Sequence, residues 1–197
     1  MFVIFGGSFD PIHVGHLLIA RDVMERLDAT GVIFVPAYHA PLKEEHGASA
    51  EDRLEMVRIA IEGQENFFLE DYEVKRGGIS YTVNTLEHMV SKLKGKPYLM
   101  LGADSFMRLH LWRLPERVLE LANPLVVDRE GKLDEVRAYV REKFPSLREG
   151  ENLTLLKVRR IDISATEIRK RLREGKSIYC MVPDRVREYI ERKVLYR

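Results

Sequence analysis

Residues 1–16 read MFVIFGGSFDPIHVGH, and this stretch decides the fold. The apolar run at residues 2–5 suits a short buried strand, and two glycines follow it at once. A helix-period pattern then begins at Val14 and continues to residue 27. Strand, glycine-rich turn and helix in this order form the first unit of a parallel α/β sheet, where the first turn is the usual phosphate cradle.

Apolar runs typical of buried strands alternate with helix-period segments along the rest of the chain. The runs are residues 2–5, 32–35, 67–69, 98–101, 125–127 and 153–158, and the helical segments are 14–27, 51–61, 83–93, 133–144 and 165–173. Pro183 and Asp184 open a last helix. We therefore predict an α/β fold with a doubly wound parallel sheet, a C-terminal helical part over about residues 164–197, and one domain over residues 1–197.

The composition is typical of a globular protein, and the net charge of the chain is close to zero. The 197 residues are 45% hydrophobic and 32% charged, with a formal net charge of +1. This balance argues against a broad electrostatic grip on nucleic acid or a membrane, so a bound anion should be held by a few placed groups. No run reaches the ~20 apolar residues of a membrane span, and a cytoplasmic location is expected. The lone Cys180 is expected to be a half-buried small hydrophobe.

The turn after the first strand carries groups suited to a phosphate. Gly6 and Gly7 permit positive φ and a close approach of the backbone to a ligand. His13 and His16, three residues apart, share one face of the first helical turn and can donate N–H groups to growing negative charge. Two other interpretations stay open: a tight turn with packed histidines, and a metal set with Asp10, which the spacing disfavours.

A second candidate phosphate site stands near the other end of the chain, in DISATEIRKRL (residues 162–172). Ser164 followed by Glu167 is a capping box, so a helix begins here with free N–H groups that can bind an anion. Thr166 adds a hydroxyl, and Arg169 adds a guanidinium suited to phosphate. The alternative is an ordinary capped helix in which Glu167 pairs with Arg171.

Together these strings resemble the nucleotidyltransferase superfamily, which transfers AMP or CMP from a nucleoside triphosphate to a phosphate-bearing acceptor. GGSFDPIHVGH is similar to its T/HxGH signature, and residues 163–169 are similar to its ISxTxxR motif. The resemblance implies ATP binding by Gly6, Gly7, Ser8, Phe9, His13, His16, Gly102, Asp104, Ile163, Ser164, Thr166 and Arg169. A string that faintly resembles the KMSKS loop of class I aminoacyl-tRNA synthetases, HMVSKLK at residues 88–94, lies inside an amphipathic helical pattern. We interpret it as a solvated helix face, which weighs against a tRNA-binding module.

The middle and the tail of the chain resemble the bacterial nicotinate-nucleotide adenylyltransferases. The resemblance rests on ISYTVNTL (79–86) with YEVKR before it, on LGADSFMRLHLW (101–112), and on the closing YCMVPDRVREYIERKVLYR. It implies that Trp112 stacks on the pyridine ring and that Ser105 lies by the ribose and phosphates. The implied residues for the nicotinate nucleotide are Asp10, Tyr81, Thr82, Thr85 and Trp112.

Two departures from the family pattern affect expected phosphate contacts. AYHAPLK (37–43) stands where the family commonly reads PPHK, so Leu42 replaces a histidine while Lys43 matches. VVDREG (126–131) lacks the proline of the family's RPG segment, which leaves Arg129 as a neighbour of the adenine or ribose. With these positions, the resemblance implies that the residues assisting the reaction are His13, His16, Lys43 and Arg169.

The implied reaction moves AMP from ATP to nicotinate mononucleotide and gives nicotinic acid adenine dinucleotide and pyrophosphate, in NAD biosynthesis. Mg²⁺ is expected to arrive with ATP, with no dedicated metal site in the protein. The partners are then these two small molecules, without nucleic acid or membrane, and a homo-oligomer stays open. Alternatives are the same chemistry on nicotinamide mononucleotide or 4′-phosphopantetheine, and a nucleotide-binding regulator without catalysis.

Overall fold

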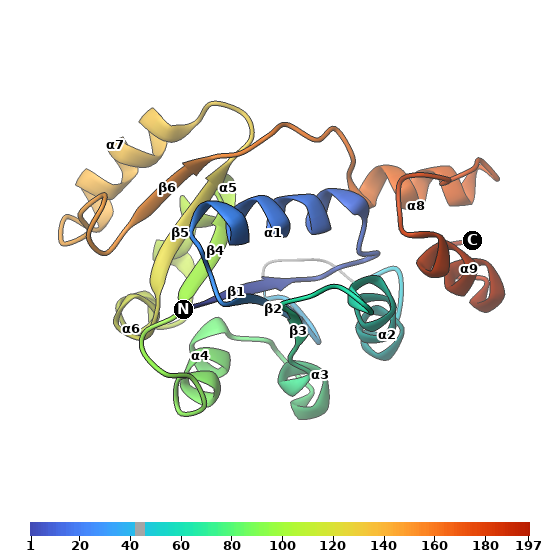
Figure 1. The fold of residues 1–197 in the computed structure, drawn as a ribbon, viewed down its shortest axis with the longest axis horizontal. Coiled ribbons are helices and arrows are strands. Elements are labelled where there is room, and N and C mark those ends of the chain that lie inside the picture. The colour runs from blue at the N-terminus through green and yellow to red at the C-terminus, as the bar shows by residue number, and fades with distance from the viewer. Residues whose placement is uncertain (42–45) are drawn as a thin grey trace.

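The computed structural model describes residues 1–41 and 46–197, and over these residues it builds a six-stranded parallel sheet flanked by helices (Figure 1). The strands are β1 (Phe2–Gly7), β2 (Gly31–Pro36), β3 (Phe67–Leu69), β4 (Tyr98–Gly102), β5 (Asn123–Asp128) and β6 (Thr154–Lys157). The helices are α1 (Val14–Arg26), α2 (Ala50–Ile61), α3 (Tyr72–Arg76), α4 (Thr82–Val90), α5 (Ala103–Phe106), α6 (Pro115–Leu121), α7 (Leu133–Lys143), α8 (Ala165–Arg173) and α9 (Asp184–Lys193), with a 3₁₀ turn at Leu109–Leu111.

The sheet is doubly wound, as the alternation of strands and helices predicts. Its strand order is β3-β2-β1-β4-β5-β6, and β1 pairs in parallel with both β2 and β4. The chain therefore runs outward to one edge, returns to the centre at β4 and runs outward again. The point where the order reverses lies between the carboxyl ends of β1 and β4, which is where ligands bind in such sheets.

Successive residues of the central strands point to opposite faces, so the sheet separates two apolar layers. Val3 and Phe34 belong to the layer shared with α1, α2, α8 and α9. Ile4 and Val35 belong to the layer shared with α4, α6 and α7. Figure 1 shows α1 and α4 on opposite sides of the sheet, α9 close to α2, and α8 beyond the N-terminal end of α1. The C-terminal helices therefore share the core beneath α1 and α2.

The six predicted strand runs are all strands, but two residue-level expectations are wrong. Gly6 and Gly7 permit positive φ but do not form the turn: they extend β1 and pair with Val35 and Pro36, and the positive φ falls on Phe9 instead, at 45°. Cys180 is exposed rather than half-buried, because it lies in the turn before α9 with φ 62°.

The helix predicted over residues 83–93 already ends at Val90. The short helices α3, α5 and α6 were not predicted, because each is too brief to show a helical period. In residues 1–41 and 46–197 we find no helical segment with both the length and the hydropathy of a bilayer span.

Candidate active site

The turn between β1 and α1 brings His13 and His16 together. His13 is the residue before α1, with φ −141°, and its backbone N–H donates to Nδ1 of His16 at 3.2 Å. The two imidazole rings stack with their centroids 3.7 Å apart. The His16 ring also packs against Phe5 and Phe9, at centroid distances of 5.9 and 5.1 Å. The predicted shared face is therefore confirmed, and both rings are held in place before any ligand binds.

Burial sets the charge of His13 in the free protein. Its side chain is 4% exposed, and burial, followed by the positive charge of Arg129, lowers the pKa of His13 to about 4. The imidazole is therefore neutral at pH 7. A phosphate group placed beside it would favour the imidazolium, so the protonation of His13 is coupled to anion binding.

Helix α8 contacts the same loop through Arg169, one turn beyond its N-terminal cap. Ser164 caps α8 by accepting a hydrogen bond from the N–H of Glu167 at 3.1 Å, which is one of the two bonds of the predicted capping box. Arg169 reaches back from α8, and its Nη1 donates to the carbonyl of Asp10 at 2.7 Å. Its Nη2 lies 3.3 Å from the hydroxyl of Thr166. The two candidate phosphate sites, far apart in the sequence, therefore form one region.

A hollow beside α8 joins this region to the end of β5. It has a volume of about 580 Å³, and Arg129, Ile163 and Ser164 are among its lining residues. Arg129 is close enough to His13 to lower the pKa of that imidazole. The hollow therefore contains the predicted neighbour of adenine or ribose together with two residues of the second motif.

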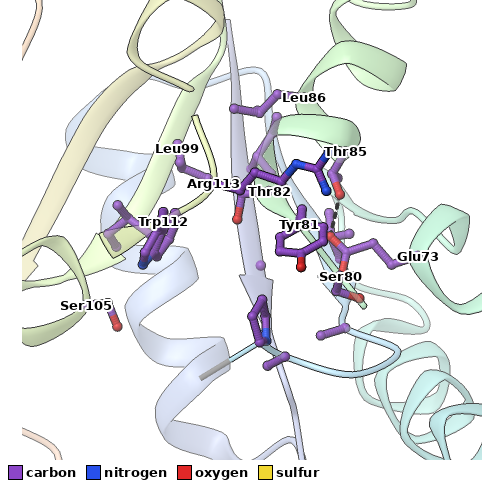
Figure 2. Close-up of a pocket in the computed structure, with 18 of the residues that line it drawn as sticks. Glu73, Ser80, Tyr81, Thr82, Thr85, Leu86, Leu99, Ser105, Trp112 and Arg113 are labelled. Atoms are coloured by element: carbon purple, nitrogen blue, oxygen red, sulfur yellow. Dashed lines mark hydrogen bonds between the residues drawn. The ribbon is translucent and has the colours of Figure 1, made fainter. Parts of the chain in front are cut away.

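A second cavity, of about 350 Å³, opens at the carboxyl ends of β1 and β4. Figure 2 shows Trp112 and Tyr81 on opposite sides of it, so that two aromatic rings face the same space. The predicted residues that line this cavity are Gly6, Gly7, Ser8, Tyr81, Thr82, Thr85, Ser105 and Trp112. An apolar cavity with a few polar groups is the usual form of a small-molecule site.

Three charged residues that line this cavity were not predicted. Glu73 accepts a hydrogen bond from the Thr85 hydroxyl, and burial raises the pKa of the Glu73 carboxyl (Figure 2). The Arg113 guanidinium lies 4.8 Å from the centre of the Tyr81 ring, and Arg108 lines the cavity close by. Arg113 directly follows Trp112 and Glu73 lies within YEVKR, so proximity to recognised motifs was the signal that could have found them.

Other predicted residues lie elsewhere. Asp104 is exposed and pairs with Lys132 at 2.8 Å, and neither it nor Gly102 lines the two hollows. The Phe9 side chain is 2% exposed and belongs to the core, and Phe9 lines neither hollow. Asp10 is buried and hydrogen-bonds within the protein instead of lining the cavity by Trp112. Lys43 and Leu42 lie outside the described residues.

Arg53 of α2 holds the loops around the site together, and sequence reasoning missed it. Its side chain is 1% exposed. Its guanidinium donates to the carbonyls of Ser8 at 2.8 Å, Ala37 at 2.6 Å and Tyr38 at 2.7 Å. One buried cation thereby joins the turn after β1 to the loop after β2. Its partners are backbone carbonyls, which leave no mark in a sequence.

A metal site of the kind considered for Asp10, His13 and His16 needs several His, Cys, Asp or Glu side chains close together. In the part of the chain that the structure describes, no three of these side chains lie together in a way that could hold a metal ion. The stacked histidines therefore have no third ligand of this kind among those residues, and the metal interpretation of Asp10, His13 and His16 gains no support.

Comparisons with known proteins agree with these observations. Residues 4–171 match the cytidylyltransferase-like family. A probable nicotinate-nucleotide adenylyltransferase from Aquifex aeolicus is 55% identical over 168 residues, which cover 85% of this chain and 100% of that protein. Another, from Desulfatibacillum aliphaticivorans, is 39% identical over 98% of both chains. The fold superimposes with a TM-score of 0.78 on Plasmodium falciparum nicotinic acid mononucleotide adenylyltransferase complexed with NaAD, at 19% identity over 99% of this chain and 96% of that one.

Proposed function

The chain belongs to the cytidylyltransferase-like family and, within it, to the nicotinate-nucleotide adenylyltransferases, and from this membership we propose how its residues perform the reaction. It is an enzyme that transfers AMP from ATP to nicotinate mononucleotide. The products are nicotinic acid adenine dinucleotide and pyrophosphate, and the reaction belongs to NAD biosynthesis.

The observation that carries the proposed mechanism is the position of the stacked His13–His16 pair. The pair lies at the switch point of the sheet, on the turn after β1, and Gly6 and Gly7 at the end of that strand line the cavity that holds Trp112. The same turn contacts Arg169 of α8 through the carbonyl of Asp10. A triphosphate on this turn would reach the histidines, Arg169 and an acceptor in the cavity at once.

In the proposed step, an oxygen of the acceptor's 5′-phosphate attacks the α-phosphorus of ATP in line. The new P–O bond forms as the bond from the α-phosphorus to the bridging oxygen breaks, and pyrophosphate leaves with that oxygen. Positioning and charge stabilisation supply most of the catalysis in such transfers. His13, His16 and Arg169 stabilise the phosphoryl charge, and Lys43 is proposed to assist. Mg²⁺ enters as part of the MgATP substrate.

The acceptor's ring is proposed to lie in the cavity between Trp112 and Tyr81. Two facing aromatic side chains suit a flat pyridine ring. Arg108 and Arg113 supply positive charge to the same cavity, which favours an anionic acceptor. A 4′-phosphopantetheine acceptor has no aromatic ring to stack between them, and nicotinamide mononucleotide has no ring carboxylate.

The direct test follows pyrophosphate release from MgATP with each acceptor in turn. We expect turnover with nicotinate mononucleotide to exceed turnover with nicotinamide mononucleotide and 4′-phosphopantetheine. The variant H16A should lower kcat by about 10²–10³-fold while keeping the wild-type circular dichroism spectrum, because one charge-stabilising donor is lost. If the protein binds ATP but releases no pyrophosphate from it with any of these acceptors, it is instead a nucleotide-binding regulator.

A further inference from the structure

The segment after α9 returns to the turn between β1 and α1 through Tyr196. The Tyr196 ring is buried, and its hydroxyl donates to Oδ1 of Asp10 at 2.8 Å. Burial, followed by the charge of Asp10, raises the pKa of Tyr196. The hydroxyl therefore stays protonated, and remains a hydrogen-bond donor, over the whole pH range in which an enzyme works.

The Asp10 carboxylate joins this hydroxyl to two other parts of the chain. Its Oδ2 accepts from the backbone N–H of Gly47 at 2.7 Å, and its Oδ1 also accepts from the N–H of Ala48 at 3.1 Å. Nη1 of Arg169 lies 3.8 Å from Oδ2 and donates to the Asp10 carbonyl at 2.7 Å. Asp10 thus connects the loop after β2, helix α8 and the C-terminal segment.

Side-chain packing ties Tyr196 to Arg169 a second time. A Cβ atom at Gly47 would lie 2.8 Å from Cδ1 of Tyr196 and 3.0 Å from Cδ of Arg169. The backbone of Gly47 is therefore pressed against both the tyrosine ring and the aliphatic part of Arg169. Only a residue without a side chain fits there, and the tyrosine limits the space available to the arginine.

We propose that Tyr196 is a positioning residue for adenylyl transfer, which fixes the Asp10 carboxylate and through it aims Arg169 at the triphosphate. This inference rests on the proposed function for the identity of the phosphate ligand, MgATP. It gives the C-terminal segment a part in the reaction, although Tyr196 itself does not touch the substrate. Removal of the hydroxyl leaves Oδ1 of Asp10 with the Ala48 N–H alone, while Oδ2 keeps the Gly47 N–H, so the carboxylate is held less firmly beside Arg169.

The variant Y196F removes the hydrogen bond and keeps the ring. Since a hydrogen bond to a charged group is lost next to Arg169, we expect the KM and the Kd for MgATP to rise about tenfold. The KM for nicotinate mononucleotide should stay within about twofold, because the acceptor cavity does not include Tyr196.

The chain offers a matched control in Y189F. The Tyr189 hydroxyl donates to Oδ1 of Asp52 at 2.8 Å, the same kind of bond at the same length, but it joins α9 to α2 away from the two hollows. Y189F should lower the thermal midpoint about as much as Y196F and leave both KM values unchanged. Equal KM values in Y196F and Y189F would overturn the inference and leave Tyr196 with a structural role only.

A double-mutant cycle tests whether Tyr196 acts through Arg169. In the R169M background, Y196F should weaken MgATP binding by less than about twofold, because the group it positions is gone. A full additive loss would overturn the inference.

If Y196F does not fold, the variant G47A tests the inference instead. The added methyl group crowds the Tyr196 ring against Arg169 and should weaken MgATP binding. Unchanged MgATP binding in G47A would overturn the inference.

Calorimetric titration with MgATP alone separates this inference from the proposed function. Weaker MgATP binding in Y196F than in the wild-type protein supports the positioning role. This holds even if the wild-type protein releases no pyrophosphate with nicotinate mononucleotide, a result that would contradict only the proposed function. Rapid turnover by the wild-type protein, with equal MgATP affinity in the wild-type protein and Y196F, would support the proposed function and overturn the positioning role of Tyr196.

Discussion

Among single residues, His13 combines a strongly lowered pKa with a central position in the site. The unfolded chain binds a proton at this histidine below about pH 6.5, whereas the folded protein binds it only below about 4. Stability therefore rises with pH between these values, because the unfolded state holds more protons there. Below both values the imidazole is charged inside the fold, and its burial then costs on the order of 3 kcal/mol of stability relative to pH 7.

The variant H13N should remove this pH dependence. We expect the free energy of unfolding, measured with urea between pH 4 and 7, to vary less with pH in H13N than in the wild-type protein. H110N, which replaces an exposed imidazole, should keep the wild-type slope. A slope unchanged in H13N would show that His13 is not buried in the neutral form.

Trp112 is the one tryptophan in the sequence, so its fluorescence reports directly on the cavity that it lines. We expect nicotinate mononucleotide to quench this fluorescence. W112A should raise the KM for that acceptor by about 5- to 100-fold, from the loss of ~1–3 kcal/mol of ring stacking. W112F should recover most of the loss, and neither variant should change the KM for MgATP. An unchanged KM for the acceptor in W112A would show that the acceptor's pyridine ring does not bind between Trp112 and Tyr81.

Between elements, the loops around the site depend on α2 as much as on the strands that they follow. Arg53 connects the carbonyls of Ser8, Ala37 and Tyr38, and it also donates to the carbonyl of Ala48 at 3.3 Å. R53M should destabilise the fold by about 3–5 kcal/mol, because it leaves several buried carbonyls without donors. R58M on the same helix, where Arg58 pairs with Glu55 at the surface, should change stability by less than about 0.5 kcal/mol. The free energies of unfolding of the two variants would be measured by urea denaturation, and equal values would contradict the prediction for Arg53.

The same elements show what a sequence can and cannot predict. Strands β1, β2, β4 and β5 are buried on both faces, so each is a continuous apolar run that is easy to recognise. Helix α8 was predictable because Ser164 and Glu167 form a local cap. Arg53 and Tyr196 were not, because their partners are backbone carbonyls or a carboxylate 186 residues away, and neither leaves a periodic or local pattern.

The same distinction between local sequence patterns and long-range contacts applies to the candidate site. Tyr81 and Trp112 lie in short strings that resemble a known family, and the structure brings them to one cavity. Asp10 lies in such a string too, but its carboxylate turns inward to backbone N–H groups and to Tyr196. A motif therefore predicted which segments meet, whereas the direction of each side chain depended on packing that only the fold determines.

On the scale of the whole molecule, the prediction of one domain over residues 1–197 becomes a question about cooperativity. The apolar layer beneath α1 contains residues from β1 as well as from α8 and α9, including Val3, Ile168 and Ile190. The opposite layer contains Leu99 and Phe106, with Trp112 packed against it. The strands of one sheet separate the two layers, so neither layer can lose its packing without exposing the strands that support the other.

The chain carries a unique probe on each side of this sheet. Trp112 packs against the layer of α4 and α6, and the exposed Cys180, the single cysteine, lies between α8 and α9 and accepts a thiol-reactive dye. If residues 1–197 form one cooperative unit, urea unfolding followed by Trp112 fluorescence and by the dye should give the same midpoint and the same slope. Y189F, which loses the hydrogen bond from α9 to Asp52, should shift both transitions together. A dye transition at lower urea than the tryptophan transition would mean that α8 and α9 unfold first, and the C-terminal helices would then be a separate unit that docks Arg169 and Tyr196 onto the site.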